Sequence, residues 1–295
     1  MTYLLFLALA PAIFLMYYVW NKDKSKEPFG MLLFLVILGV LSCIPAAIIE
    51  GVLDDIISAF FSGNTYIYNF IKAFFGVALI EEGCKFVFMY LYTHKHKEFN
   101  GLFDGMVYAV FVSLGFAALE NVFYVVDGGA GVAVARGLMA VPGHMFFGVF
   151  MGYYYSLWHV NKLCDESEKY FAKLGFIQIK APSYKYSKNL VKAVVVPVLF
   201  HGLYDFCLFT ENIYFIFLNL ALVIALYIVC FARIKKMSSS DIEDYKLIPQ
   251  LLCQKYPELT HIVNPTVVNP MSVPQDYYTT LQNKAVYYDP YANMK

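Results

Sequence analysis

Charged residues are scarce in this sequence. Of its 295 residues, 15% are charged and 60% are hydrophobic, whereas a soluble domain carries about 25% charged residues. The 22 basic and 22 acidic side chains give a formal net charge of zero, so neither the basic surface of a nucleic-acid-binding protein nor an acidic tail is predicted. This composition excludes an ordinary soluble domain and is typical of a polytopic membrane protein.

Several other signatures are missing. The six cysteines are spaced singly, with no C-x-x-C pair, which excludes a zinc ribbon and a disulfide-stapled secreted domain. The first apolar segment lacks the positive flank of a secretory signal and is too long for one, so it is predicted to be a retained anchor. No inverted repeat of the transporter kind is visible.

Long apolar runs dominate the sequence instead. Crossing a bilayer takes about 20 mostly apolar helical residues. Such runs predict an all-α, polytopic helical bundle embedded in the lipid bilayer, with seven transmembrane helices. The predicted spans are 2–20, 29–49, 66–92, 103–126, 131–157, 191–209 and 214–232.

Lysines mark alternate loops between these spans. Loops 21–28, 93–102 and 158–190 contain lysine, whereas the three other short loops contain neither lysine nor arginine. Because cytoplasmic loops collect basic residues, the N-terminus is predicted to lie outside and the C-terminus in the cytoplasm. His94, His96 and His159 lie in or beside the basic loops and are expected to be solvated.

The predicted chain has two parts. Residues 1–232 form the transmembrane domain, and residues 233–295 form a cytoplasmic tail. The tail contains half of the twelve prolines and two tyrosine pairs but no long apolar run. It is expected to be partly disordered, with one short helix around 241–254.

Three ionisable residues interrupt the third span. Glu81, Glu82 and Lys85 lie within five residues, and each charge at the bilayer centre costs about 2.5–3.5 kcal/mol. Glu81 and Lys85 have the i,i+4 spacing of an ion pair on one helix face. Glu82 projects about 100° away and needs a partner on another helix. Glu81 is thus either half of a structural ion pair or a catalytic residue. The three charged residues together indicate a functional site more than a purely structural one.

Histidines occur in the fifth and sixth spans. His144 and His201 each follow a proline within four residues, and the prolines loosen the two helices. Asp205 follows His201 at i,i+4, where its carboxylate can orient the imidazole. Glu82, His144 and His201 are predicted at similar depth, near the middle of the membrane. A single cavity shared by these residues is therefore expected.

Polar and small residues also mark the fourth and fifth spans. Glu120 and Asn121 are predicted at the same level as Arg136, across a short loop, so Glu120 and Arg136 are expected to form a structural ion pair. Gly148 and Gly152 follow His144 at intervals of four residues. This stripe lets a neighbouring helix approach closely.

Several known protease chemistries lack their residues. No serine in the spans has a positioned base, only one aspartate lies deep in a span, and no His-Glu-x-x-His sequence occurs. What remains is water activated by a carboxylate, with histidines relaying protons. Metal-assisted hydrolysis stays open, with Zn²⁺ held by His144, His201 and Glu82.

Four motifs on successive spans, taken together, resemble the PrsW family of intramembrane proteases. This family is related to the type II CAAX prenyl endopeptidases and to the bacteriocin-processing membrane proteases. The resemblance covers residues 1–232. The motifs are Glu81-Glu82-x-x-Lys85, Phe103-Asp104-Gly105 with Gly115-Phe116-Ala117-x-x-Glu120-Asn121-x-x-Tyr124, His144 with Gly148 and Gly152, and His201-Gly202-x-Tyr204-Asp205.

The resemblance implies a multi-pass protease of the bacterial cytoplasmic membrane that cleaves a membrane-anchored protein such as an anti-sigma factor. Glu81 and Glu82 would be the essential glutamates, and one of them would activate water. His144 and His201 would assist proton transfer or hold the oxyanion. The supporting residues would be Lys85, Glu120, Asn121, Arg136 and Asp205.

The sequence leaves one alternative for the cofactor and two alternatives for the function. The family has been called a metalloprotease family, but its relatives resemble glutamate-dependent enzymes, so no cofactor is firmly expected and zinc is the alternative. A different interpretation of the same Glu and His residues is a proton relay in a proton-coupled transporter or channel. A third is a non-catalytic protein that binds a transmembrane partner through its glycine stripe.

Overall fold

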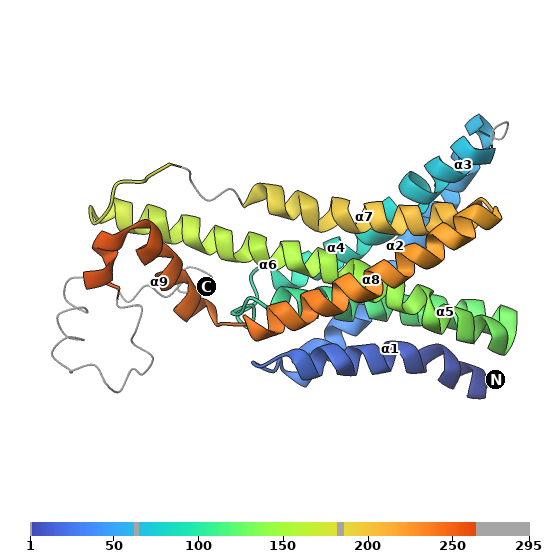
Figure 1. The fold of residues 1–295 in the computed structure, drawn as a ribbon, viewed down its shortest axis with the longest axis horizontal. Coiled ribbons are helices and arrows are strands. Elements are labelled where there is room, and N and C mark those ends of the chain that lie inside the picture. The colour runs from blue at the N-terminus through green and yellow to red at the C-terminus, as the bar shows by residue number, and fades with distance from the viewer. Residues whose placement is uncertain (1, 62–64, 182–185, 264–295) are drawn as a thin grey trace.

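The computed structural model describes residues 2–61, 65–181 and 186–263. Within these ranges the chain is helical and forms no β-strand, apart from one isolated bridge between Gly101 and Glu243. Figure 1 shows the long helices running lengthwise, with α9 at one end and the N-terminus at the other. The elements are α1 (Thr2–Lys22), α2 (Phe29–Phe61), α3 (Thr65–Ile71), the π-helical segment η1 (Lys72–Ala78), α4 (Leu79–Thr93), α5 (Asp104–Leu138), α6 (Ala140–Lys173), α7 (Ser187–Phe209), α8 (Ile213–Ser239), α9 (Asp244–Lys255) and the 3-10 helix η2 (Pro257–His261).

The all-helical prediction is confirmed. Five helical stretches in the described part of the chain are long and apolar enough to cross a membrane: 2–22, 29–61, 104–173, 187–209 and 213–239. The third stretch contains both α5 and α6. The predicted span 66–92 is not among the five, because it is divided into α3, η1 and α4 and carries the charged cluster. The count of seven spans and the orientation stay predictions.

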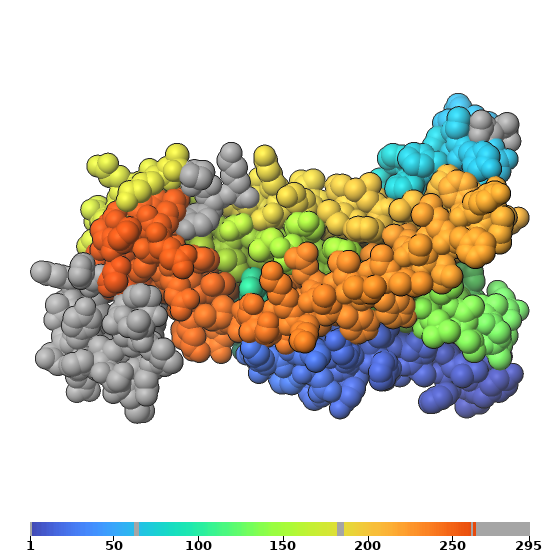
Figure 2. All heavy atoms as spheres, viewed as in Figure 1, coloured from blue at the N-terminus to red at the C-terminus, as the bar shows by residue number. Residues whose placement is uncertain are grey.

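Apolar side chains cover the outside of the bundle. On α8 they include Phe217, Ile224 and Ile228, all exposed, and Figure 2 shows α8 crossing the visible face above α1. Such an apolar exterior would be unstable in water but suits contact with lipid.

The centre of the bundle is α5 with α6. Every residue of α5 from 104 to 118 is buried, because α1, α2 and α6 all pack against this helix. The glycine stripe of α6 lies at the closest approach: a Cβ at Gly152 would lie 2.4 Å from the Cα of Met106. The predicted close packing along this stripe is confirmed, and only glycine fits at Gly152.

A sharp bend at Gly129 divides α5 into a long first part and a short second part. Gly129 has φ 75° and ψ −163°, a conformation that side-chain-bearing residues rarely adopt. The bend lies inside the predicted loop 127–130. It returns the chain alongside itself, so Arg136 meets Glu120 with 3.0 Å between Nη2 and Oε2. The predicted ion pair is confirmed.

The segment 158–173, predicted as part of a solvated loop, is instead the end of helix α6. The prediction for His159 was wrong: this ring is buried, stacks on Phe99 with 3.8 Å between centroids, and lies 2.8 Å from Asp244. His94 and His96 are half-buried. Apolar residues on this part of α6 explain the difference, because they form a second core with α9 and η2.

Residues 238–244, named here the strap, link α8 to α9 and contact the segment 100–103 that leads into α5. Asp241 accepts a hydrogen bond from the Phe103 amide, and the Asp244 amide donates to the Asn100 carbonyl. Asp23 is buried nearby. The helix expected around 241–254 is present as α9, whereas residues 264–295 of the predicted tail, with the tyrosine pairs, lie outside the described residues.

Candidate active site

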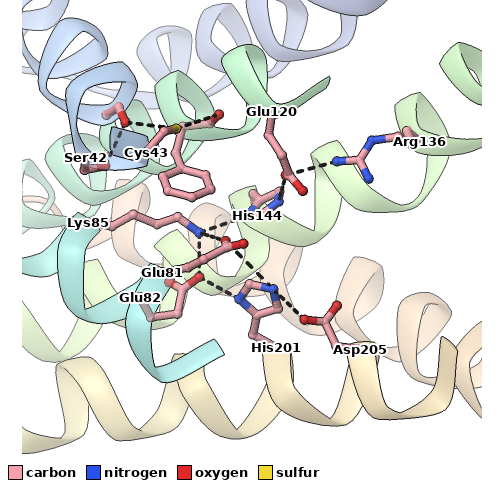
Figure 3. A network of polar contacts seen from close by, with 12 residues as sticks. Ser42, Cys43, Glu81, Glu82, Lys85, Glu120, Arg136, His144, His201 and Asp205 are labelled. Atoms are coloured by element: carbon pink, nitrogen blue, oxygen red, sulfur yellow. Dashed lines mark hydrogen bonds and ion pairs between the residues drawn. The ribbon is translucent and has the colours of Figure 1, made fainter. Parts of the chain in front are cut away.

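Polar side chains from four helices meet inside the bundle (Figure 3). Helix α4 supplies Glu81, Glu82 and Lys85, and α7 supplies His201 with Asp205. Helix α5 supplies Glu120 with its partner Arg136, and α6 supplies His144. The structure therefore brings together the residues that were predicted to share one cavity.

The π-helical segment η1 precedes the glutamates directly. π-Helical turns are rare and occur often at functional sites. Gly202 of α7 packs on this segment: a Cβ there would lie 2.6 Å from the Phe74 ring. The absence of a side chain at Gly202 thus lets α7 bring His201 close to α4. The π-helix itself was not predicted from the sequence.

Lys85 is at the centre of the cluster and is fully buried. Its Nζ lies 2.9 Å from Glu81 Oε2, 2.8 Å from Glu82 Oε1 and 3.1 Å from His144 Nδ1. The ammonium also lies over the Phe116 ring, 4.0 Å from the centroid. An ammonium has three N–H donors and no acceptor, so all three donors have partners. The Glu81–Lys85 pair is as predicted, but the contacts of Lys85 with Glu82 and His144 were not foreseen.

His201 lies between carboxylates. Its Nδ1 is 2.9 Å from Glu82 Oε1, and its Nε2 is 3.3 Å from Asp205 Oδ2 and 4.0 Å from Glu81 Oε2. Phe147 stacks on the ring at 4.7 Å. The interhelical partner that Glu82 requires is therefore His201, and the predicted contact between His201 and Asp205 is present.

His144 is oriented from two sides. Because Lys85 donates to Nδ1, the other ring nitrogen carries a proton and donates to Glu120 Oε2 at 2.8 Å. Glu120 is paired with Arg136, whose Nε donates to Asn121 Oδ1 at 2.9 Å. Glu120 is thus more than half of a structural pair, since it also fixes the orientation of His144.

A cavity of about 650 Å³ lies against this cluster. At about 30 Å³ per water molecule, this volume holds roughly 20 waters or several residues of a peptide. Its polar wall includes Glu81, Glu120, His144, His201 and Asp205. Glu82 and Lys85 lie behind this wall and do not line the cavity. The prediction of a shared cavity therefore holds for His144 and His201 but was wrong for Glu82, which contacts His201 from behind the wall.

Further charged residues line the cavity: Arg136, Glu50 from α2 and Lys72 from η1. Glu50 was not predicted as a site residue, because the predicted second span ended at residue 49. A weak signal was present in the sequence, since Glu50 is followed by Gly51-Val52-Leu53 before the next charged residues, Asp54 and Asp55. In the structure α2 continues to Phe61, so Glu50 lies within the helix.

The arrangement can be compared with a metal site. Ligand atoms of Glu81, Glu82 and His144 lie within 4.8 Å of one another. Carboxylates with a histidine are suitable zinc ligands, but the Lys85 ammonium contacts these three side chains at 2.8–3.1 Å. A cation of higher charge does not fit beside this ammonium. The set predicted for zinc included His201, which is not part of this group.

Comparison with known proteins decides the family. The model of the PrsW family intramembrane metalloprotease matches residues 27–232. The chain belongs to the PrsW family. It is 35% identical over 235 residues to Protease PrsW of Oceanobacillus iheyensis, a match that covers 79% of this chain and 95% of the relative. It is 29% identical to Protease PrsW of Halalkalibacterium halodurans over 81% of this chain and 98% of the relative. No solved structure matches the chain.

The family confirms the resemblance inferred from the motifs and makes the chain a membrane protease with bacterial relatives. The matched residues 27–232 include all four motifs and every residue of the cluster. Residues 233–263, with the strap and α9, lie outside the match. The interpretations as a transporter and as a non-catalytic binding protein find no support in these relatives.

Proposed function

We propose that the chain is an intramembrane endopeptidase that hydrolyses a peptide bond of a membrane-anchored protein, using water activated by Glu81. The observation that carries the proposal is the position of Glu81: it lines the cavity together with His144 and His201, whereas Glu82 is fully buried behind it. A general base must reach the water that it deprotonates. Glu82 is then a positioning residue that holds His201 and Lys85 in place.

The reaction follows from these positions. Glu81 takes a proton from a cavity water as the water oxygen bonds to the substrate carbonyl carbon. His201 donates from Nε2 to the oxyanion, since its contact with Asp205 at 3.3 Å is long and easily exchanged. Glu81 then returns the proton to the amide nitrogen as the carbon–nitrogen bond breaks. His144 supports the base by helping to hold the Lys85 ammonium next to it.

No step in this proposal passes through a metal. A metal bound by Glu81, Glu82 and His144 would polarise the carbonyl or lower the pKa of water, but the ammonium of Lys85 lies against these ligands. We therefore favour glutamate chemistry over zinc chemistry, in a family described as metalloproteases.

The proposed setting is the bacterial cytoplasmic membrane. In this proposal α3, η1 and α4 together complete a seventh crossing, with the N-terminus outside and residues 233–295 in the cytoplasm. The support is the alternation of basic loops. An anti-sigma factor is the proposed type of substrate, by analogy with the family.

The test is cleavage of a single-span reporter by the purified full chain in detergent. Glu81→Gln should lower kcat by about 10²–10⁴-fold, the usual contribution of a general base, and His201→Ala should also lower it. Glu166→Gln, a change of an exposed glutamate on α6, is the matched control. Unchanged cleavage by both Glu81→Gln and His201→Ala would contradict the proposal. Inactivation by a chelator, reversed by zinc, would contradict the metal-free chemistry.

A further inference from the structure

Glu50 lines the cavity but takes no part in the cluster of catalytic groups. It lies on α2 and lines the same 650 Å³ space as Glu81 and His201. Its Oε1 is buried and has no hydrogen-bond partner among the residues that the structure describes. The residue as a whole is half-buried, and a buried carboxylate oxygen without a partner is unfavourable unless something else binds it.

The cations beside the cavity already have partners. Lys72 is 2.7 Å from Asp54, and Arg136 is 3.0 Å from Glu120. The ammonium at the centre of the catalytic cluster is bound by both α4 glutamates. Within the described residues no ion pair involves Glu50, so its carboxylate is the one in the cavity wall that lacks a contacting cationic or imidazole side chain.

Glu50 lies where two hollows meet. A second hollow of about 270 Å³ shares Glu50 and Lys72 with the larger cavity and continues along α2 towards Asp54 and Ile57. A substrate segment bound at Glu81 and continuing into the second hollow would therefore pass Glu50.

We propose that Glu50 is a specificity-determining residue that binds a lysine or arginine side chain of the substrate, a few residues from the bond that is cleaved. This inference rests on the proposed endopeptidase function. A substrate cation would give Glu50 a charge-assisted hydrogen bond, and a single carboxylate on a wall without further free ligands suits a basic side chain better than a metal ion.

The test uses a set of single-span reporters in which each position near the cleaved bond is replaced in turn by Lys, Gln or Glu. The purified full chain should cleave one Lys reporter with a kcat/KM about tenfold above that of the matching Gln reporter, which corresponds to about 1.4 kcal/mol. Glu50→Gln should remove this ratio while the Gln reporter is cleaved as before. Glu50→Lys should favour the Glu reporter.

Asp55→Asn is the matched control, since Asp55 is an exposed acidic residue on the same helix, outside both hollows. The inference is overturned if Glu50→Gln lowers cleavage of Lys and Gln reporters by the same factor, because Glu50 would then act in the chemistry or the fold. It is also overturned if the wild-type ratio persists in Glu50→Gln.

Binding separates this inference from the proposed function. In a Glu81→Gln background, fluorescently labelled Lys and Gln reporters should differ about tenfold in Kd, and adding Glu50→Gln should remove the difference. If the wild type cleaves no reporter, the proposed endopeptidase activity fails, but the Kd ratio still supports or overturns the role of Glu50.

Discussion

Replacing Lys85 by methionine tests the central electrostatic feature of the site. The substitution keeps an unbranched side chain over the Phe116 ring but removes the ammonium that contacts Glu81, Glu82 and His144. Removing one partner of a buried ion pair costs about 3–5 kcal/mol. We expect the free energy of unfolding to fall by about this amount in the absence of metal.

Zinc should reverse the loss, because the change leaves two carboxylates and an imidazole facing a vacated position. A ligand at 100 times its Kd stabilises the folded state by about 2.7 kcal/mol, which would restore most of the stability. The assay is unfolding of the detergent-solubilised protein with and without zinc, together with its metal content. The wild type and a Lys72→Met control, which changes a lysine that lines the cavity outside the cluster, should show no such zinc response.

One result would refute this reasoning. Suppose that the purified wild type holds one tightly bound metal ion per chain and that Glu81→Gln releases it. Glu81, Glu82 and His144 would then bind a metal, and the Lys85 ammonium would not occupy its place. Proteolysis gives a second measurement. Lys85→Met should also lower kcat by at least about 10²-fold, because Glu81, the proposed base, would lose the ammonium that holds its carboxylate in position.

Three further predictions concern helix packing, an ion pair and the strap, all outside the cluster of Glu81, Glu82 and Lys85. Gly152→Ala would place a Cβ 2.4 Å from the backbone of α5, and thermal unfolding should show a loss of about 1–3 kcal/mol or more; Gly30→Ala, with nothing within 4 Å, should be neutral or slightly stabilising. Arg136→Gln should cost about 1–3 kcal/mol by removing a charged partner of Glu120, and an equal stability in denaturant titrations would contradict the ion pair. Burial and a nearby strap carboxyl raise the pKa of Asp23 from 3.8 to about 6. Its stabilising effect is therefore present at low pH and is lost as pH rises through about 6. Protection of the strap amides from hydrogen exchange, relative to the rate of an unfolded chain at the same pH, should therefore fall as pH rises towards 6, and Asp23→Asn should make this protection less dependent on pH.

Contacts within one helix, or across one short turn, were predictable. The i,i+4 spacing places Glu81 beside Lys85 and His201 beside Asp205 whatever surrounds them. Arg136 and Glu120 lie on either side of the short turn at Gly129, so their pairing also depends only on nearby parts of the chain. These contacts require only helical geometry and the position of a turn.

Contacts between helices were predictable only as a group. Similar depth in the membrane predicted one cavity for Glu82, His144 and His201, but depth does not give the rotation of each helix about its axis. That rotation makes His201 the partner of Glu82 and directs His144 towards Lys85.

The sequence by itself determined the all-helical membrane class, four ordered motifs and the family to which they belong. It did so because hydrophobic length and residue spacing are local properties of the chain. Only the tertiary structure decided that Glu81 faces the cavity while Glu82 does not, that Lys85 lies among the three candidate metal ligands, and that Glu50 belongs to the cavity wall. The strap and the docking of α9 on α6 were decided in the same way. The physical reason is that exposure to the cavity depends on how neighbouring helices pack, and close approaches such as those at Gly152 and Gly202 set that packing.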